Sequence, residues 1–185
     1  MAAEAPKVEL GFRAPDFALP AVDGATVQLA DAAGANGTVV AFICNHCPYV
    51  KAIAGRLVRD AKDLSQHGVS VIAINANDAD AYPDDSFDNM KLFARHHGFP
   101  FPYLYDEAQT VARAYGAVCT PDFFGFDRDL TLQYRGRLDS SRNVEGPPDA
   151  PRELYDAMRQ VAEVGTAPGQ QHPALGCSIK WRTAS

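Results

Sequence analysis

Two closely spaced cysteines are the residues of this chain best suited to chemistry. Cys44 and Cys47 are separated by two residues, Pro48 follows directly, and the apolar segment 38–43 precedes them. A strand that leads into a helix brings sulfur to the unpaired amides and positive dipole of the helix N-terminus, where a thiolate is stabilised. The motif therefore predicts a reactive cysteine with a pKa below the ~8.5 of a free thiol.

Pro48 indicates which of the two cysteines begins the helix. Proline suits the first helical position, whereas deeper in a helix its ring clashes with the carbonyl four residues earlier. If Cys44 were the helix cap, Pro48 would be the fourth helical residue and would meet the Cys44 carbonyl. Cys47 is therefore the predicted helix cap and nucleophile, with Cys44 as a neighbour in the preceding loop.

Length and charge limit the possible classes of protein. With 185 residues and 46% hydrophobic content, we expect a single domain over 1–185, in which residues 166–185 form a C-terminal tail. The formal net charge is -6 and no block of like charge occurs, which argues against binding to nucleic acid or to an anionic membrane. Small molecules and other proteins remain as partners.

The redox state of the cysteines depends on the cellular compartment of the protein. Residues 1–9 carry no apolar stretch typical of a signal sequence, and no segment approaches the ~20 apolar residues of a membrane span, so we expect a cytoplasmic protein. Thiols there are kept reduced, and a static disulfide framework is not expected. Redox chemistry, metal binding and burial remain for the four cysteines, Cys44, Cys47, Cys119 and Cys177.

Alternating element types predict an α/β fold that would position these sulfurs. Buried strands over 38–43 and 69–74 enclose a helix from Pro48 to about Gln66, which makes a βαβ unit. The other expected elements are a hairpin over 17–29, a helix over 86–97, a strand over 101–104, a helix over 107–115, an antiparallel pair over 123–126 and 130–134, and a helix over 152–164. They predict a central mixed sheet with helices on both faces and Cys47 at its rim.

Three separated motifs carry a family resemblance. They are residues 11–19 with Asp23-Gly24 behind them, the Cys47-Pro48 junction, and residues 115–121 leading to Phe126-Asp127. In order and spacing they resemble the thioredoxin-like superfamily, in particular its peroxiredoxin-like branch (redoxin, AhpC/TSA type), from about residue 11 to residue 165. The resemblance implies a thioredoxin-like fold, with Cys47 as the attacking cysteine and Pro121, after Thr120, as a cis-proline that faces it.

The chain also departs from the patterns of these families. Val50 stands where thioredoxins have their second cysteine, and Ala41 stands where those reductases carry a buried acid. Cys44 replaces the threonine that peroxiredoxins keep three residues before the attacking cysteine. No arginine has an obvious peroxidase context, and Arg135 and Arg137 are the candidates.

The second sulfur of a redox cycle must therefore come from another position. Cys44 is close in sequence and ranks first, and Cys119, two residues before Pro121, ranks second. Cys177 ranks third. The resemblance implies a role for Cys177 because some peroxiredoxins carry a resolving cysteine in a C-terminal tail, which acts within its own subunit or across a possible homodimer.

Ordinary structural roles compete with these chemical ones. Free cysteine is among the most buried residue types, and for Cys119 burial and chemistry weigh equally. His46 could stabilise a thiolate as an imidazolium or could be a solvent-exposed loop residue. Trp181 indicates that the tail around Cys177 docks, and Asp122 is expected at a strand end rather than as a base.

The favoured function is a thiol peroxidase that needs no cofactor. Cys47 would become a sulfenic acid, a second cysteine would form a disulfide with it, and a thioredoxin-like or low-molecular-weight thiol would reset the enzyme. One alternative is a reductase of protein disulfides. Another is non-enzymatic metal or cofactor binding through Cys44 and Cys47, which have the spacing of half a zinc site that His46, Cys119 or Cys177 would complete. The last is an interaction module without turnover.

Overall fold

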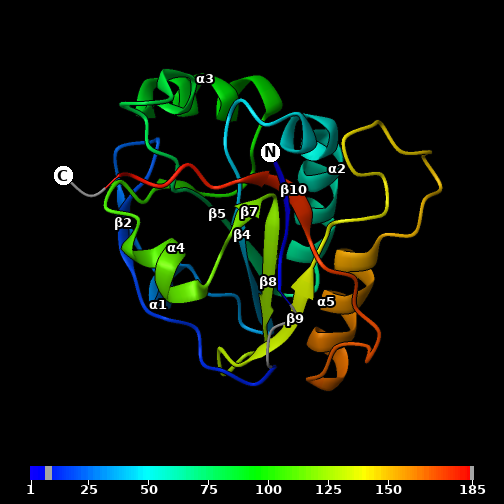
Figure 1. Cartoon of the computed structure of the whole chain (residues 1–185). Coiled ribbons are helices and arrows are strands. Elements are labelled where there is room, and N and C mark those ends of the chain that lie inside the picture. The colour runs from blue at the N-terminus through cyan, green and yellow to red at the C-terminus, as the bar shows by residue number, and fades with distance from the viewer. Residues whose placement is uncertain (7–9, 184–185) are drawn as a thin grey trace.

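A five-stranded mixed sheet in the order β6-β5-β4-β8-β9 organises the protein (Figure 1). The computed structural model describes residues 1–6 and 10–183. The strands are β1 Ala2–Glu4, β2 Ala18–Pro20, β3 Thr26–Gln28, β4 Gly37–Phe42, β5 Val69–Asn75, β6 Tyr103–Tyr105, β7 Cys119–Thr120, β8 Asp122–Phe126, β9 Leu132–Gly136 and β10 Leu175–Ser178. The helices are α1 Leu29–Ala32, α2 Pro48–Ser65, the 3-10 helix η1 Pro83–Asp85, α3 Phe87–His97, α4 Thr110–Tyr115 and α5 Glu153–Val164.

The predicted βαβ unit is confirmed. Strand β4 pairs in parallel with β5, β5 pairs in parallel with β6, and β8 and β9 complete the sheet as antiparallel strands. Helix α2 connects β4 to β5, so the start of α2 lies at the carboxyl end of β4. This junction is where the sequence places Cys44 and Cys47.

Alternating side chains of the sheet build a core on each face. Val39 and Ala41 pack with α2 and α5, whereas Val40 and Phe42 pack with α4 and the residues around the β2–β3 hairpin. Successive residues of a strand point to opposite faces, and both faces of β4 are covered, which is why this strand reads as one apolar run. Figure 1 shows α2 and α5 on one side of the sheet and α1 and α4 on the other.

Strand β6 begins at Tyr103 instead of residue 101. Helix α4 and strand β9 also begin later than predicted, and a residue with positive φ stands shortly before each. Gln109 has φ of 61°, so α4 begins at Thr110 instead of residue 107. The Gln109 side-chain amide donates to the carbonyls of Ala76 and Lys180, and these bonds hold it in place. Leu130 has φ of 60°, and β9 accordingly begins at Leu132.

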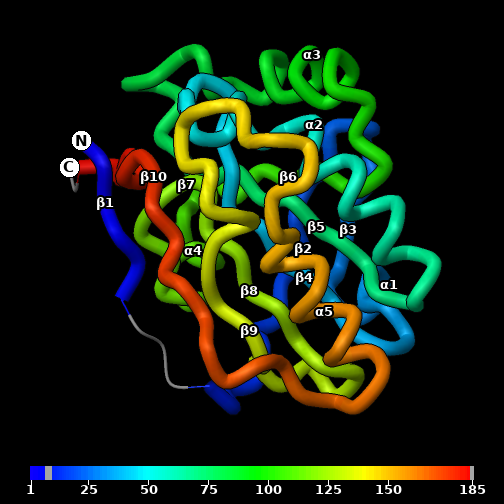
Figure 2. The backbone as a smooth tube through the Cα atoms, turned by 90° about the vertical axis from the view of Figure 1, so that its right-hand side faces the viewer, coloured from blue at the N-terminus to red at the C-terminus, as the bar shows by residue number. Residues whose placement is uncertain are grey.

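The C-terminal tail contains a strand that the sequence did not predict. Strand β10 lies between β1 and β7 in a separate three-stranded sheet, with Cys177 opposite Thr120 and Gly176 opposite Ala3. Figure 2 shows the segments near the two termini side by side. Beyond the strand, Trp181 packs against the core, so this part of the tail docks as expected.

Among the described residues, no helix is both long enough and apolar enough to cross a bilayer.

Candidate active site

Cys47 occupies the predicted position at the start of α2. It is the N-cap of the helix, Pro48 is the first helical residue, and the Cys47 carbonyl accepts from the Lys51 amide at 3.0 Å. The Cys47 side chain is fully buried. The identification of the helix cap from Pro48 is therefore confirmed.

The loop before β8 brings the predicted proline to the same place. The Thr120–Pro121 peptide bond is cis, as predicted. In its thiol form, Cys47 Sγ donates to the Thr120 carbonyl at 3.3 Å, and Cys44 Sγ lies 3.3 Å from Thr120 Oγ1. The fold thus unites Cys44, Cys47, Thr120 and Pro121, which the sequence assigned to one site.

Hydrogen bonds decide which sulfur of this site ionises. The Cys44 thiol makes the largest contribution to lowering the pKa of Cys47, to about 5, against the opposing effect of burial. The Cys177 thiol and the amides of Val50 and Cys177 lower the Cys47 pKa further. The same Cys44–Cys47 hydrogen bond, with burial and the charge of Asp85, raises the pKa of Cys44 well above its ordinary value. The negative charge therefore resides on Cys47.

Cys177 reaches this cluster from the tail. Its backbone lies opposite Thr120 in the β10–β7 pair, and its thiol is one of the groups that lower the pKa of Cys47. Burial and the interaction with Cys47 raise the pKa of Cys177 to about 11. Cys177 is partly exposed, whereas Cys44 and Cys47 are buried.

Cys119 has a different environment, although it precedes Thr120 directly. Its sulfur faces the carbonyls of Pro121 at 3.8 Å and Ala174 at 4.0 Å, and its side chain packs with Ala5 in a small apolar cluster. Burial raises the pKa of the Cys119 thiol. Neighbouring residues of a strand point to opposite faces, which explains why Thr120 contacts Cys44 and Cys47 while Cys119 packs elsewhere.

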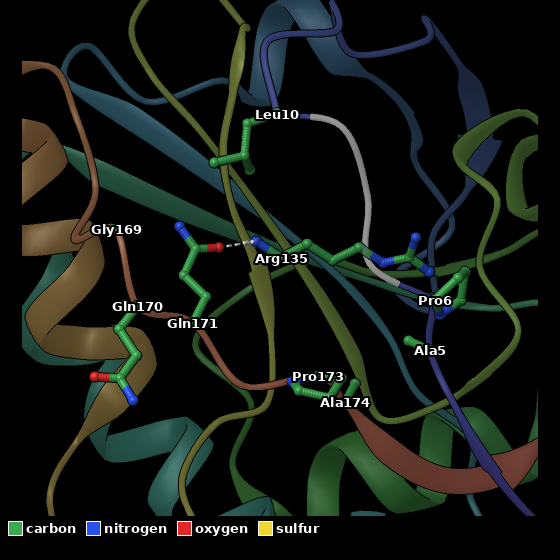
Figure 3. A pocket seen from close by; sticks show the side chains of 9 residues that line it. All are labelled: Ala5, Pro6, Leu10, Arg135, Gly169, Gln170, Gln171, Pro173 and Ala174. Carbon is green, nitrogen blue, oxygen red and sulfur yellow. Dashed lines mark hydrogen bonds between the residues drawn. The ribbon is translucent and has the colours of Figure 1, made fainter.

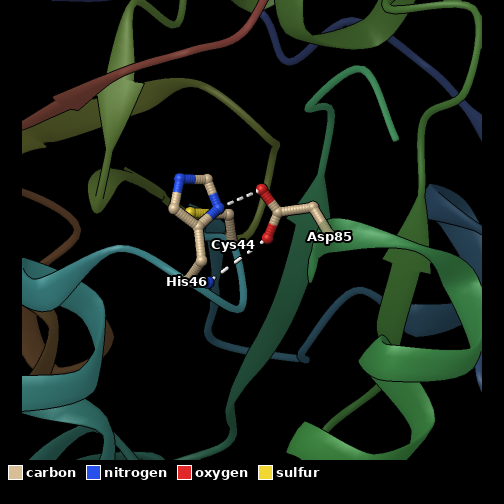
Figure 4. Close-up of side chains that lie close together, drawn as sticks. All are labelled: Cys44, His46 and Asp85. Atoms are coloured by element: carbon tan, nitrogen blue, oxygen red, sulfur yellow. Dashed lines mark hydrogen bonds and ion pairs between the residues drawn. The ribbon is translucent and has the colours of Figure 1, made fainter. Parts of the chain in front are cut away.

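Asp85 is a residue of the site that sequence reasoning missed (Figure 4). Its fully buried carboxylate accepts from the amides of Asn45 at 2.7 Å and His46 at 3.3 Å through Oδ1. Its Oδ2 lies 2.5 Å from His46 Nδ1 and 2.8 Å from Asn77 Nδ2. The loop between the two cysteines is thereby tied to η1.

His46 contacts Asp85 and stacks on the ring of Tyr82, with 6.1 Å between the ring centroids. The donor atoms of Cys44, His46 and Asp85 all lie within 4.8 Å of one another, a set of ligand types that zinc accepts. Asp85 already accepts four hydrogen bonds, so an ion at this position would have to replace some of them. The arrangement fits a hydrogen-bonded carboxylate better than a metal ligand.

The two candidate arginines are already paired with carboxylates. Arg135 forms a buried ion pair with Asp122 at 2.8 Å and also donates to the Gly116 carbonyl at 2.9 Å. Arg137 binds Glu153 at 2.8 Å. Burial raises the pKa of Asp122 despite its partner, and this residue is part of the fold at the start of β8.

The pocket shown in Figure 3 lies apart from the sulfur cluster. Its volume is about 340 Å³, and Gln171, whose side-chain oxygen accepts from the Arg135 amide at 2.9 Å, is in its wall. None of the cysteines lines it. A second pocket of about 200 Å³ has Pro121, Ile53 and Leu175 in its lining, so this smaller pocket adjoins the cis-proline.

Comparisons with known proteins agree with this site. The model of the AhpC/TSA family matches residues 10–135, which is more than half of the chain. A thiol-disulfide oxidoreductase ResA from Bacillus thuringiensis is 27% identical over 134 residues, covering 69% of this chain and 69% of the relative.

Solved structures share the whole fold or its central part. An uncharacterized conserved protein from Geobacillus kaustophilus superposes with a TM-score of 0.94 at 50% identity, covering 100% of this chain and 98% of the other. Peroxidoxin BcpB from Mycobacterium tuberculosis superposes with a TM-score of 0.58 at 21% identity, covering 69% of this chain and 84% of the other. The fold is therefore thioredoxin-like, as the sequence motifs implied.

The match to the family model includes Cys47, the cis-proline and the strands that position them. Relatives detected by sequence are named for thiol and disulfide chemistry, which requires a reactive sulfur such as that of Cys47. The chain therefore belongs to the AhpC/TSA family, within the thioredoxin-like superfamily, and is a thiol-based oxidoreductase.

Proposed function

We propose that this protein is a two-cysteine thiol peroxidase of the cytoplasm, in which Cys47 attacks a small hydroperoxide. The observation that carries the proposal is a sulfur with a pKa of about 5 that has no exposed surface. A nucleophile that is ionised yet covered favours an oxidant small enough to enter a closed site. A peroxide meets this requirement better than the disulfide of a folded protein.

The first step oxidises Cys47. Its thiolate attacks one peroxide oxygen, an S–O bond forms, the O–O bond breaks, and the leaving oxygen takes a proton to depart as water or an alcohol. The product is a sulfenic acid. A second thiol then attacks the Cys47 sulfur, loses its proton and expels water, which leaves a disulfide.

The contacts favour Cys177 as this second thiol, although sequence proximity ranked Cys44 first. Both thiols lower the pKa of Cys47, but only Cys177 of the two is partly exposed. A disulfide between Cys47 and Cys177 therefore keeps one sulfur within reach of an external thiol. Cys44 serves as the hydrogen-bond donor that stabilises the Cys47 thiolate.

An external thiol completes the cycle. It attacks Cys177, forms a mixed disulfide there and releases Cys47, whose low pKa makes it a good leaving group. A second external thiol then frees Cys177 and leaves as a disulfide of the reductant. A thioredoxin-like protein or a low-molecular-weight thiol suits this role.

A second candidate is a thiol–disulfide reductase. The observation that favours it is the pairing of Arg135 with Asp122 and of Arg137 with Glu153, which leaves neither guanidinium free to bind a peroxide. Cys47 would then attack a substrate disulfide, and a neighbouring thiol would release the mixed disulfide. The names of the ResA relatives agree with this reaction.

Single-turnover kinetics test the proposal. Reduced protein is mixed with one equivalent of hydrogen peroxide, peroxide loss is followed, and the new disulfide is mapped by mass spectrometry. We expect rapid consumption and a Cys47–Cys177 linkage, no reaction in Cys47→Ser, and unchanged behaviour in the control Cys119→Ser. Inertness toward peroxide together with turnover of a disulfide substrate would overturn the peroxidase in favour of the reductase.

A further inference from the structure

Asp85 is a buried carboxylate to which the proposed reaction gives no chemical role. It is fully buried, and its side chain reaches the loop that joins Cys44 to Cys47. Asn75 Nδ2 donates to the Asp85 carbonyl at 3.0 Å, so the backbone of Asp85 is held as well. Burying a carboxylate costs free energy, and such a group calls for a physical reason.

The carboxylate is placed by both of its oxygens. Oδ1 accepts from two consecutive amides, those of Asn45 and His46, which are the residues between the cysteines. Oδ2 faces His46 Nδ1 and Asn77 Nδ2. These bonds fix the negative charge of Asp85 close to the Cys44 sulfur. The Cys44 Sγ, a ring nitrogen of His46 and a carboxylate oxygen of Asp85 all lie within 4.8 Å of one another.

We propose that Asp85 is the positioning residue that selects the nucleophile: its fixed charge keeps Cys44 as a thiol, and Cys44 in turn donates its hydrogen to Cys47. The inference rests on Cys47 being the reactive sulfur, and it holds for the peroxidase and for the reductase. Two negative charges this close in a site shielded from water repel each other strongly. The thiolate charge of the cysteine pair therefore resides on Cys47, whose sulfur has the larger number of hydrogen-bond donors.

The groups around Cys44 agree with this assignment. Cys47 faces it from α2, Thr120 from β7, and Asp85 and His46 from η1 and the connecting loop. Tyr103 on β6 donates its hydroxyl hydrogen to Asn45 at 2.8 Å, and burial raises its pKa well above the ordinary value, so it adds no charge.

The effects on the two sulfurs are opposite in sign. The charge of Asp85 is among the causes that raise the pKa of Cys44, after the hydrogen bond to Cys47 and burial. The causes that lower the pKa of Cys47 begin with the hydrogen bond from Cys44. Asp85 thus acts on the nucleophile through Cys44.

The test measures the ionisation of Cys44 directly. In a Cys47→Ser chain, the ultraviolet absorbance of the thiolate is followed against pH, with Cys119→Ser and Cys177→Ser added so that Cys44 is the remaining thiol. Adding Asp85→Asn should lower the midpoint of Cys44 by at least about one pH unit, a tenfold change in acidity. The matched control is Asp84→Asn, an exposed neighbour in the same 3-10 helix, which should leave the midpoint unchanged.

A second measurement uses the chain with both cysteines intact. In Asp85→Asn, the proportion of alkylating reagent found on Cys44 relative to Cys47 should rise by about tenfold. Asn77→Ala removes a hydrogen bond to Asp85 but keeps the charge. If Asp85 were only a structural brace, both variants would lose stability and neither would change the labelling ratio, and that result would overturn the inference.

Another variant covers the case in which Asp85→Asn does not fold. His46→Asn keeps the carboxylate and its two amide bonds but removes the imidazole that faces it. Because the carboxylate is retained, the midpoint of Cys44 should not fall, and a midpoint lowered by about one pH unit would contradict the inference. None of these measurements uses peroxide. If the protein proved inert toward peroxide, the proposed peroxidase activity would be refuted, but these measurements would still test the role of Asp85.

Discussion

At the scale of single residues, several hydrogen-bond donors together stabilise the negative charge on Cys47. The thiols of Cys44 and Cys177 and the amides of Val50 and Cys177 all lower the pKa of this sulfur. Together they outweigh burial, which alone would disfavour a charged sulfur. Because two of these donors are themselves thiols, the reactivity of Cys47 depends on the redox state of its neighbours.

The pH dependence of Cys47 follows from its low pKa. A thiol reacts as the thiolate, which dominates above the pKa, so the rate should be half-maximal near pH 5 and level at higher pH. In Cys44→Ala, loss of the largest stabilising hydrogen bond should move the midpoint toward the ordinary value of 9.0. Stopped-flow alkylation against pH measures both midpoints, and a wild-type midpoint near the ordinary value would contradict the assignment.

The role of Cys177 predicts a difference between two variants. Cys177→Ser should still consume the first equivalent of peroxide but lose most of its steady-state turnover with a thiol reductant, because the exposed sulfur is missing. Cys119→Ser removes a buried thiol from the separate cluster and should keep its turnover. Coupled turnover assays compare the two variants. Equal turnover would contradict the role of Cys177 and would favour Cys44 as the resolving cysteine.

At the scale of elements, the close approach of β10 to β7 depends on a residue without a side chain. A Cβ atom built on Gly176 would lie 1.9 Å from the Thr120 carbonyl oxygen, far closer than any ordinary contact. The neighbouring residue, Cys177, can therefore approach Cys47 only because Gly176 lets the two strands meet.

Gly176→Ala should displace β10. We expect the free energy of unfolding to fall by roughly 1–3 kcal/mol, the usual cost of overpacking, and Cys47 to become reactive toward a bulky aromatic disulfide. The matched control is Gly169→Ala, where a Cβ would meet no atom within 4 Å. Denaturant titration and the rate of thiol labelling measure the two effects; labelling as slow as in the control would show that β10 does not cover the site.

At the scale of the whole molecule, a buried ion pair joins the neighbouring strands β8 and β9 to the end of α4. Asp122 on β8 and Arg135 on β9 are both almost completely buried, and Arg135 also donates to the carbonyl of Gly116 after α4. The guanidinium lies 4.4 Å from the Phe124 ring centroid. These contacts stabilise β8, the strand that follows Pro121, in its position in the sheet.

Removing one member of this pair should be costly. Asp122→Ala leaves an unpaired guanidinium in the interior, and we expect a loss of about 3–5 kcal/mol in the free energy of unfolding. In contrast, Asp88→Ala breaks an exposed pair with Lys91 and should change stability by less than about 1 kcal/mol. Chemical denaturation of both variants tests this, and equal losses would contradict it.

Local signals in the sequence were sufficient for the main elements and for the position of Cys47 at the start of a helix. Pro48 identified Cys47 as the helix cap, the helix predicted over 86–97 matches α3 with its caps Ser86 and Gly98, and the apolar run identified the central strand. Each of these assignments depends on the conformational preferences of a few neighbouring residues, which can be read directly from the sequence. The fold class and the cis-proline came from motifs whose order resembled a family.

Only the tertiary structure decided which groups surround Cys47. Asp85 reads as part of a polar loop, and β10 is a short strand whose partners, β1 and β7, lie far from it in the chain. No local preference records such pairings, because their free energy arises only when distant segments meet. The sequence by itself determined that Cys47 lies at the start of a helix, and the packing of η1 and β10 decided which groups surround Cys44 and Cys47.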